Sequence, residues 1–240
     1  MGLAHPFLLG GLLAIFALHL RRGIDETEAF IFHRQEQPQH KPLARLLLHW
    51  RQVLLAIGIT VGGTVSFYTY TVYMQKFMVN SAGLSKDDAT IAAASALLLY
   101  MPLQPLFGLL SDVIGRRPVL IVFGVSATVF TVPLLQAMSQ AHDAVTAFLL
   151  NFAGLLILSG FTSIHMVVKS ELFPANIRAL GVGLPYAVTT SILGGTTEFL
   201  ALRLKDAGHE SYFYWYERMR CDFLARLPVY ARNEEPVTNR

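Results

Sequence analysis

A compact charged motif, G-L-L-S-D-V-I-G-R-R-P, occupies positions 108–118. Its candidate functional residues are Gly108, Asp112, Gly115, Arg116 and Arg117. Small Gly108 lets helices approach closely, and the second glycine permits a tight turn. The two arginines can pair with the aspartate or with the carbonyl groups that end a helix. A plain basic turn would explain the arginines but not the whole pattern, so we interpret the motif as an ion-pairing turn.

Glu171 and Arg178 flank a later loop on the same predicted side of the chain. Together with Asp112, Arg116 and Arg117 they predict a charge cluster that ties helix ends together. An exposed ion pair contributes about 1 kcal/mol or less. Such a cluster can therefore favour one of two conformations without preventing the change to the other. Anchoring at the membrane interface is the alternative interpretation of these charges.

Polar side chains interrupt the apolar stretches and are candidates for binding a polar solute. Tyr68, Thr71 and Gln75 are spaced i, i+3, i+7, which places them on one face of an α-helix. Hydrogen-bond donors on that face would suit a carboxylate substrate, although tyrosine near a span end is also a common interface anchor. Gln104, between two prolines, and Asn151 are two further candidates for a cavity lining.

Glu198 is the one carboxylate that falls inside an apolar stretch after position 53. An intramembrane carboxylate is a candidate proton carrier. However, it lies roughly 27 Å along its helix from the cytoplasmic start, at 1.5 Å per residue. That position favours the alternative of an interfacial acid near Arg203.

Six apolar stretches are long enough to cross about 30 Å of hydrocarbon. They are Leu3–Leu20, Val53–Met74, Ala89–Leu110, Val119–Met138, Ala144–Val168 and Leu180–Leu202. The fold class predicted from them is an all-α, polytopic membrane protein. Ten Lys and Arg residues lie in alternate loops and four in the opposite ones, which places the loop from Arg21 to Arg51 in the cytoplasm. The first stretch then begins outside, which hints at a missing N-terminal half.

Composition excludes several other classes. Of the 240 residues, 53% are hydrophobic and 15% are charged, against about 25% charged in soluble domains. The single cysteine allows no internal disulfide, and the eight histidines show no metal-ligand spacing. We expect no metal, no cofactor and no nucleic-acid partner. No nucleophile–base constellation is present, so we do not expect an enzyme.

The motif at 108–118 resembles the signature cytoplasmic loop of the major facilitator superfamily, in its loop 8–9 copy. Further segments resemble the metabolite:proton symporter branch of that superfamily: Leu20–Glu28, Phe67–Asn80, Lys169–Ala187 and Gly194–Leu202. The resemblance assigns residues 1–20 to helix 6, 21–52 to the cytoplasmic central loop and 53–202 to helices 7–11. It implies a partial C-terminal bundle in a bacterial inner membrane.

The resemblance also implies a function, namely proton symport of α-ketoglutarate or a related organic acid by alternating access. Shikimate, citrate and proline or betaine are alternative substrates within the same architecture. The implied partners are the lipid bilayer, a small organic acid, a proton and a missing N-terminal half.

Residues 203–240 form a polar tail where the family has its twelfth helix. Five charged residues fall in the expected span: Glu217, Arg218, Arg220, Asp222 and Arg226. At about 2.5–3.5 kcal/mol per central charge, we expect that this segment does not cross the bilayer. Reading it one nucleotide out of register, with codons chosen to suit, gives an apolar run. A frameshifted remnant without transport activity is therefore the alternative to a functional carrier fragment.

Overall fold

A computed structural model describes residues 4–22 and 46–230 of the chain. These residues belong to two units, Met1–Lys41 and Pro42–Arg240, which are described separately. The first unit contributes one helix, α1 (Ala4–Arg22). Most of the predicted central loop, and positions 231–240 of the predicted tail, lie outside the described residues.

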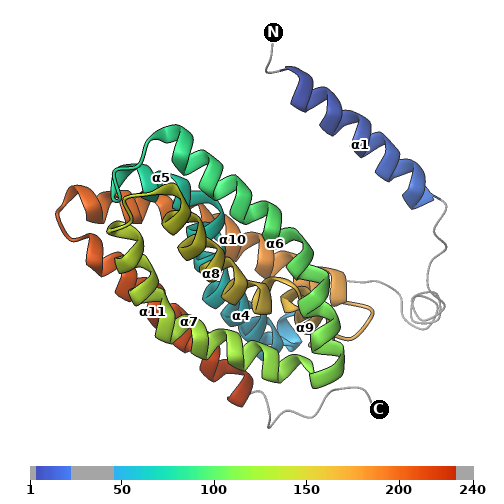
Figure 1. Cartoon of the computed structure of the whole chain (residues 1–240). Helices are drawn as coiled ribbons and strands as arrows, with labels where there is room; N and C mark the ends of the chain where they lie inside the picture. Colours follow the sequence, from blue (N-terminus) through green and yellow to red (C-terminus); the bar gives the residue numbers. More distant parts are fainter. Residues whose placement is uncertain (1–3, 23–45, 231–240) are drawn as a thin grey trace. The chain divides into compact units, whose positions relative to one another are not determined.

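The second unit is a bundle of helices (Figure 1). In order they are α4 (Trp50–Tyr68), the π-helix η1 (Thr69–Tyr73), α5 (Met74–Asn80), α6 (Lys86–Ile114), α7 (Arg116–Ser139), α8 (Ala144–Thr162), α9 (His165–Glu171), α10 (Arg178–Asp206) and α11 (Glu210–Tyr230). No strand occurs among residues 4–22 and 46–230. The prediction of an all-α fold is confirmed.

Local chemistry sets the helix boundaries. The Ser85 side chain accepts a hydrogen bond from the Asp88 amide at 3.1 Å, which caps the start of α6. Asp143 caps α8 in the same way, accepting from the Thr146 amide at 2.8 Å. These hydrogen bonds from Thr146 hold the pKa of the Asp143 carboxyl below its usual value. Gly115, with φ +91°, separates α6 from α7, as the motif predicted.

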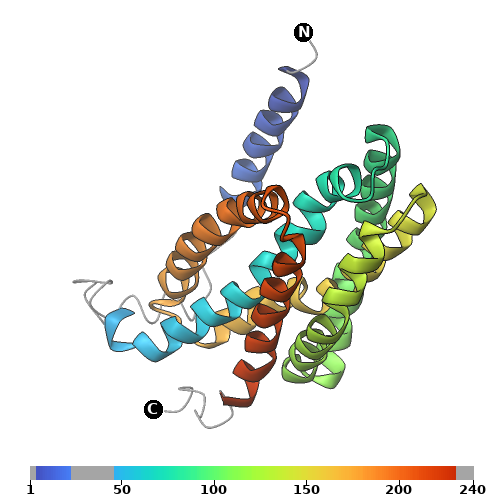
Figure 2. The ribbon, with the colours of Figure 1, turned by 90° about the vertical axis from the view of Figure 1, so that its left-hand side faces the viewer.

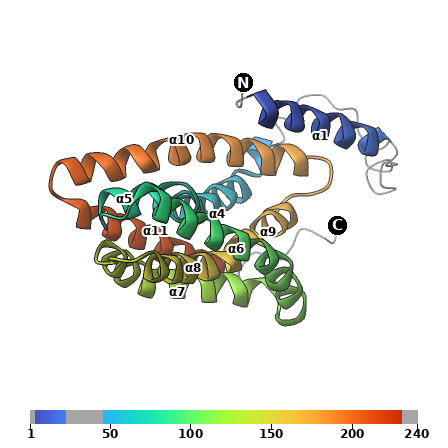
Figure 3. The same ribbon diagram turned by 45° about the horizontal axis from the view of Figure 1, so that its top comes forward.

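Four pairs of helices make the main contacts: α11 with α7, α6 with α8, α10 with α4, and α7 with α8. Figure 2 shows α11, in red, between α4 in cyan and α7 in green. Glycines allow this close approach, because a Cβ on Gly124 would lie 2.6 Å from the Ala225 Cα of α11. Figure 3 shows short α9 after α8, followed by the loop that leads to α10.

Four described helical segments are long and apolar enough to cross a membrane. They are Trp50–Asn80, Lys86–Ile114, Arg116–Ser139 and Ala144–Glu171. They correspond to four of the six predicted spans. Within α1, the residues searched contain a shorter apolar stretch, Gly10–Leu20, and α10 is long enough but not among the four. The reason lies in the sequence of α10, which carries serine, threonine, glycine and Glu198 through its length.

Most of the predicted polar tail is helical and packed. Residues 210–230 form α11, which lies against α7 and α4. Its aromatic residues Phe213 and Tyr214 are buried in the core. By length and composition α11 is not one of the four candidate spans. Helix α11, which is poorly suited to lipid, therefore lies beside α4 and α7.

Candidate functional site

The charged turn is built from the ends of three helices. Gly115 ends α6, Arg116 begins α7, and Glu171 ends α9. The Arg116 guanidinium forms an ion pair with the Glu171 carboxylate. Their side chains are 34% and 55% exposed, so water screens the pair and its contribution to stability is small. The pair joins α7 to α9.

Other members of the predicted cluster have different surroundings. The Arg178 Nε donates to the Phe173 carbonyl at 3.3 Å, within its own loop. Within residues 46–230, no ion pair of Asp112 or Arg117 is recorded. Nothing in the described bundle lies within 4 Å of a Cβ placed on Gly108. The close helix approach expected at that glycine is therefore not present within this bundle.

Tyr68, Thr71 and Gln75 do not keep the common face that their spacing predicted. The π-helix η1 inserts between the first residue and the last, and its wider turn changes the register. Tyr68 lies against Gly194 of α10, while the Gln75 amide donates to the Thr90 hydroxyl of α6 at 2.7 Å. The Thr71 hydroxyl donates to the carbonyl four residues earlier. The prediction of one face used the α-helical period, which the chain abandons here.

Gln104 belongs to a polar link between α6 and α8. The Thr162 hydroxyl of α8 donates to Gln104 Oε1 at 2.9 Å and lies 2.6 Å from the Tyr100 hydroxyl. All three side chains are partly buried. The link places two hydroxyls and one amide together on facing helices.

Asn151 lies in α8 and is completely buried. Neither its amide oxygen nor its amide nitrogen has a hydrogen-bond partner within the described part of the chain. A buried amide without partners is costly, and such groups occur at functional or strained positions. In this arrangement Asn151 is enclosed by the bundle and does not line an open cavity.

Glu198 forms an ion pair with Lys76, which joins α10 to α5. The lysine side chain is 53% exposed and the glutamate side chain 30%. The expected neighbour Arg203 instead lies over the Phe199 ring, at 5.4 Å from its centroid. Glu198 is therefore a paired carboxylate at one end of the bundle.

Lys169 is the residue that sequence reasoning missed. It lies in α9, and its side chain is completely buried. The Nζ atom donates to the Thr60 hydroxyl at 3.2 Å and lies 4.6 Å from the centroid of the Tyr186 ring. Three helices thus meet around one cation, namely α4, α9 and α10. The sequence offers one signal of this burial, since Lys169 lies next to an apolar run and four residues after His165.

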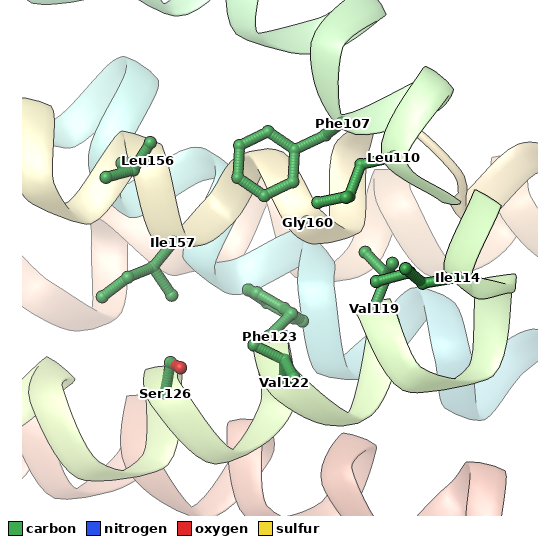
Figure 4. A pocket seen from close by; sticks show the side chains of 10 residues that line it. All are labelled: Phe107, Leu110, Ile114, Val119, Val122, Phe123, Ser126, Leu156, Ile157 and Gly160. Atoms are coloured by element: carbon green, nitrogen blue, oxygen red, sulfur yellow. The ribbon is translucent and has the colours of Figure 1, made fainter. Parts of the chain in front are cut away.

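An apolar groove of about 220 Å³ lies between α6, α7 and α8 (Figure 4). Phe107, Leu110 and Ile157 are typical of its lining, and Ser126 supplies the one side-chain hydroxyl. Such a surface suits hydrocarbon and offers no cation to a carboxylate. The described residues also contain no group of three metal-ligating side chains.

The profile of the family described as "Sugar (and other) transporter" matches residues 20–223. The chain belongs to this family. It is a multi-pass membrane protein of the major facilitator superfamily and is not an enzyme. No solved structure matches the chain.

Curated relatives place the chain within the family. The α-ketoglutarate permease of Escherichia coli (strain K12) is 45% identical over 214 residues, which cover 88% of this chain and 48% of the permease. The citrate-proton symporter of Klebsiella pneumoniae is 29% identical, over 95% of this chain and 52% of the symporter. The proline/betaine transporter of E. coli (strain K12) is 28% identical, over 82% and 41%. The chain spans about half the length of these relatives.

Proposed function

We propose that this chain forms the C-terminal bundle of a proton-coupled carrier for α-ketoglutarate or a related organic acid in a bacterial inner membrane. The observation that carries the proposal is the 45% identity to the E. coli α-ketoglutarate permease over 88% of the chain. The citrate and proline/betaine carriers are less similar, at 29% and 28%. A second bundle would supply the other wall of the substrate cavity.

Alternating access requires contacts that form in one state and break in the other. The Arg116–Glu171 ion pair joins α7 to α9 at the charged turn and is weak enough to be such a contact. Tyr68, Thr71, Gln75 and Gln104 are the candidate substrate ligands, since their hydroxyls and amides can donate to a carboxylate. Asn151 is a further candidate if α8 moves. Glu198 is the candidate proton carrier, with Lys76 as its partner in this state.

Uptake into liposomes tests the proposal. The purified chain would be reconstituted alone, and also together with the N-terminal part of the E. coli permease that it does not match. We expect accumulation of labelled α-ketoglutarate when the outside is made acidic, and its collapse when a protonophore is added. The absence of gradient-driven uptake in both preparations would overturn the proposal. Citrate and proline as competitors would rank the alternative substrates.

The alternative, a remnant without transport activity, is favoured by one observation in α11. Glu217 is completely buried, and neither of its carboxylate oxygens has a partner among the described residues. On the same helix, two guanidinium nitrogens of Arg220 also have no hydrogen-bond partner among residues 46–230. Burying a carboxylate without a partner is costly, so this segment is poorly adapted to its place in the bundle. The nucleotide sequence of the gene tests this: observed codons that give no apolar span in the shifted frame would exclude a frameshift.

A further inference from the structure

Lys169 is a buried cation whose described neighbours leave its charge unbalanced. Its side chain is completely buried in the bundle, where a charged group is costly unless it is paired. The nearest acid in the sequence is Glu171, which pairs with Arg116 instead. Within residues 46–230, no carboxylate forms an ion pair with the Lys169 ammonium. The burial of this lysine is therefore not explained by a salt bridge.

The contacts that Lys169 does make occupy only part of its hydrogen-bonding capacity. An ammonium has three N–H donors. One donates to the Thr60 hydroxyl at 3.2 Å, and that hydroxyl itself donates to the Ala56 carbonyl at 2.7 Å. The Tyr186 ring, with its centroid 4.6 Å from the Nζ atom, offers an attractive aromatic face. None of these groups carries a negative charge.

Lys169 lies in a short helix that follows a break in the chain. Helices α8 and α9 are separated by a break at Ser163 and Ile164, where Ile164 has φ −125° and ψ −16°. Discontinuous membrane helices form the binding sites of many secondary transporters. His165 begins α9, and its ring lies 6.3 Å from the Tyr186 ring. The cation thus lies after a helix break, among groups that can hydrogen-bond a polar solute.

We propose that Lys169, with Thr60 and Tyr186, forms a binding site for one carboxylate group of the transported organic acid, an inference that rests on the proposed function. The carboxylate would take the free N–H donors of the ammonium and balance its charge. The site is closed in this structure, because Lys169 is fully buried. Entry of the acid therefore requires α9 or α10 to move away from α4.

Thermal unfolding of the purified chain in nanodiscs tests the site. The unfolding temperature would be measured over a range of α-ketoglutarate concentrations for the wild type, Lys169→Met and Lys86→Met. Methionine keeps the length of the side chain and removes the charge. Lys86 is the matched control, because it is an exposed lysine at the start of α6.

For the wild type and Lys86→Met, we expect α-ketoglutarate to raise the unfolding temperature, because it binds the folded state. For Lys169→Met, we expect the half-maximal concentration to rise roughly tenfold or more, since a charge-assisted hydrogen bond is lost. Without the acid, Lys169→Met should unfold at the same temperature or higher, because it removes an unpaired buried charge. A structural lysine would instead leave the variant less stable.

The outcomes separate this inference from the proposed function. If Lys169→Met retains the wild-type response to α-ketoglutarate, the site is wrong while the carrier function stands on its own uptake test. If the wild type shows no response, the carboxylate is not that of a free acid, and the inference is overturned. If Lys169→Met lowers stability and the wild type does not respond, the partner is a protein carboxylate, which also overturns it.

Discussion

The interface between α6 and α8 and the interface around α11 differ in how their buried and partly buried polar groups are paired. Between α6 and α8, the hydroxyls of Tyr100 and Thr162 and the amide oxygen of Gln104 lie within hydrogen-bonding distance of one another. In α11, by contrast, the Glu217 carboxylate is fully buried and has no hydrogen-bond partner within residues 46–230. Both interfaces belong to one bundle, so the difference lies in the sequences and not in the architecture.

The difference shows that a helix can pack closely against its neighbours while polar groups that it buries have no hydrogen-bond partner. The aromatic residues Phe213 and Tyr214 give α11 enough apolar surface to lie against α7 and α4. Of the charges that follow them, Asp222 and Arg226 form an ion pair, but the Glu217 carboxylate has no hydrogen-bond partner among the described residues. At the α6–α8 interface, the Thr162 hydroxyl pairs with Tyr100 and with the Gln104 amide oxygen, while the Gln104 Nε2 has no partner among the described residues. We infer that α11 is the weakest part of the bundle, and the predictions below test this inference.

The largest expected effect is at Glu217. Replacement by leucine, Glu217→Leu, should raise the free energy of unfolding by about 3 kcal/mol, because it removes a buried carboxylate without partners and keeps the volume similar. Reversible unfolding in mixed micelles would measure it. Glu217→Gln is the matched control and should gain less, because the amide remains polar and unpaired. A loss of stability in Glu217→Leu would mean that the carboxylate has a partner, and the contrast between interfaces would fail.

Gly124 tests whether α11 packs as closely as described. Gly124→Ala should lower the free energy of unfolding by about 2 kcal/mol, since the new Cβ would lie 2.6 Å from the Ala225 Cα and force the helices apart. Unfolding in the same micelles would measure the loss. Gly183→Ala is the control, because nothing in the described structure lies within 4 Å of its Cβ. If the two variants were equally stable, α11 would not pack closely against α7 at Gly124.

Sequence reasoning predicted the parts of the fold that follow from hydropathy and turn chemistry. Apolar stretches of sufficient length became helices, and Gly115 became the left-handed residue of the turn. It also predicted from charge alone that the last segment is poorly suited to lipid. That segment nevertheless packs as a helix, because Phe213 and Tyr214 supply an apolar face that an average over the window hides.

Sequence reasoning failed where tertiary contacts decide. The π-helix at positions 69–73 leaves no mark in the residue types, so the common face of Tyr68, Thr71 and Gln75 was wrongly placed. The burial of Lys169 depends on Thr60 and Tyr186, which are distant in the sequence. The Arg116–Glu171 pair was within reach of the prediction, since both charges were assigned to one cluster. The positions of the helix ends determine which of these charges form an ion pair.

The polar link between α6 and α8 is expected to have a moderate effect. Thr162→Val should lower the free energy of unfolding by about 1 kcal/mol, because the Tyr100 hydroxyl and the Gln104 amide lose their shared partner. A double-mutant cycle with Tyr100→Phe would measure the coupling. Thr196→Val is the control, because that exposed hydroxyl bonds only within its own helix. A coupling free energy of zero between positions 100 and 162 would show that these hydrogen bonds do not stabilise the α6–α8 interface. The contrast with α11 would then fail.

The smallest expected effect is at the Arg116–Glu171 ion pair. Glu171→Gln should lower the free energy of unfolding by only about 0.5 kcal/mol, because both side chains are partly exposed and water screens the pair. The exchanged variant, Arg116→Glu with Glu171→Arg, should recover the loss if the two charges interact directly. Measurement at low and high salt sharpens the result, since the contribution should fall as salt rises. A loss of several kcal/mol on Glu171→Gln would instead show that the turn is as tightly held as the packed interfaces, and that it stabilises the bundle instead of serving as a weak contact between two states.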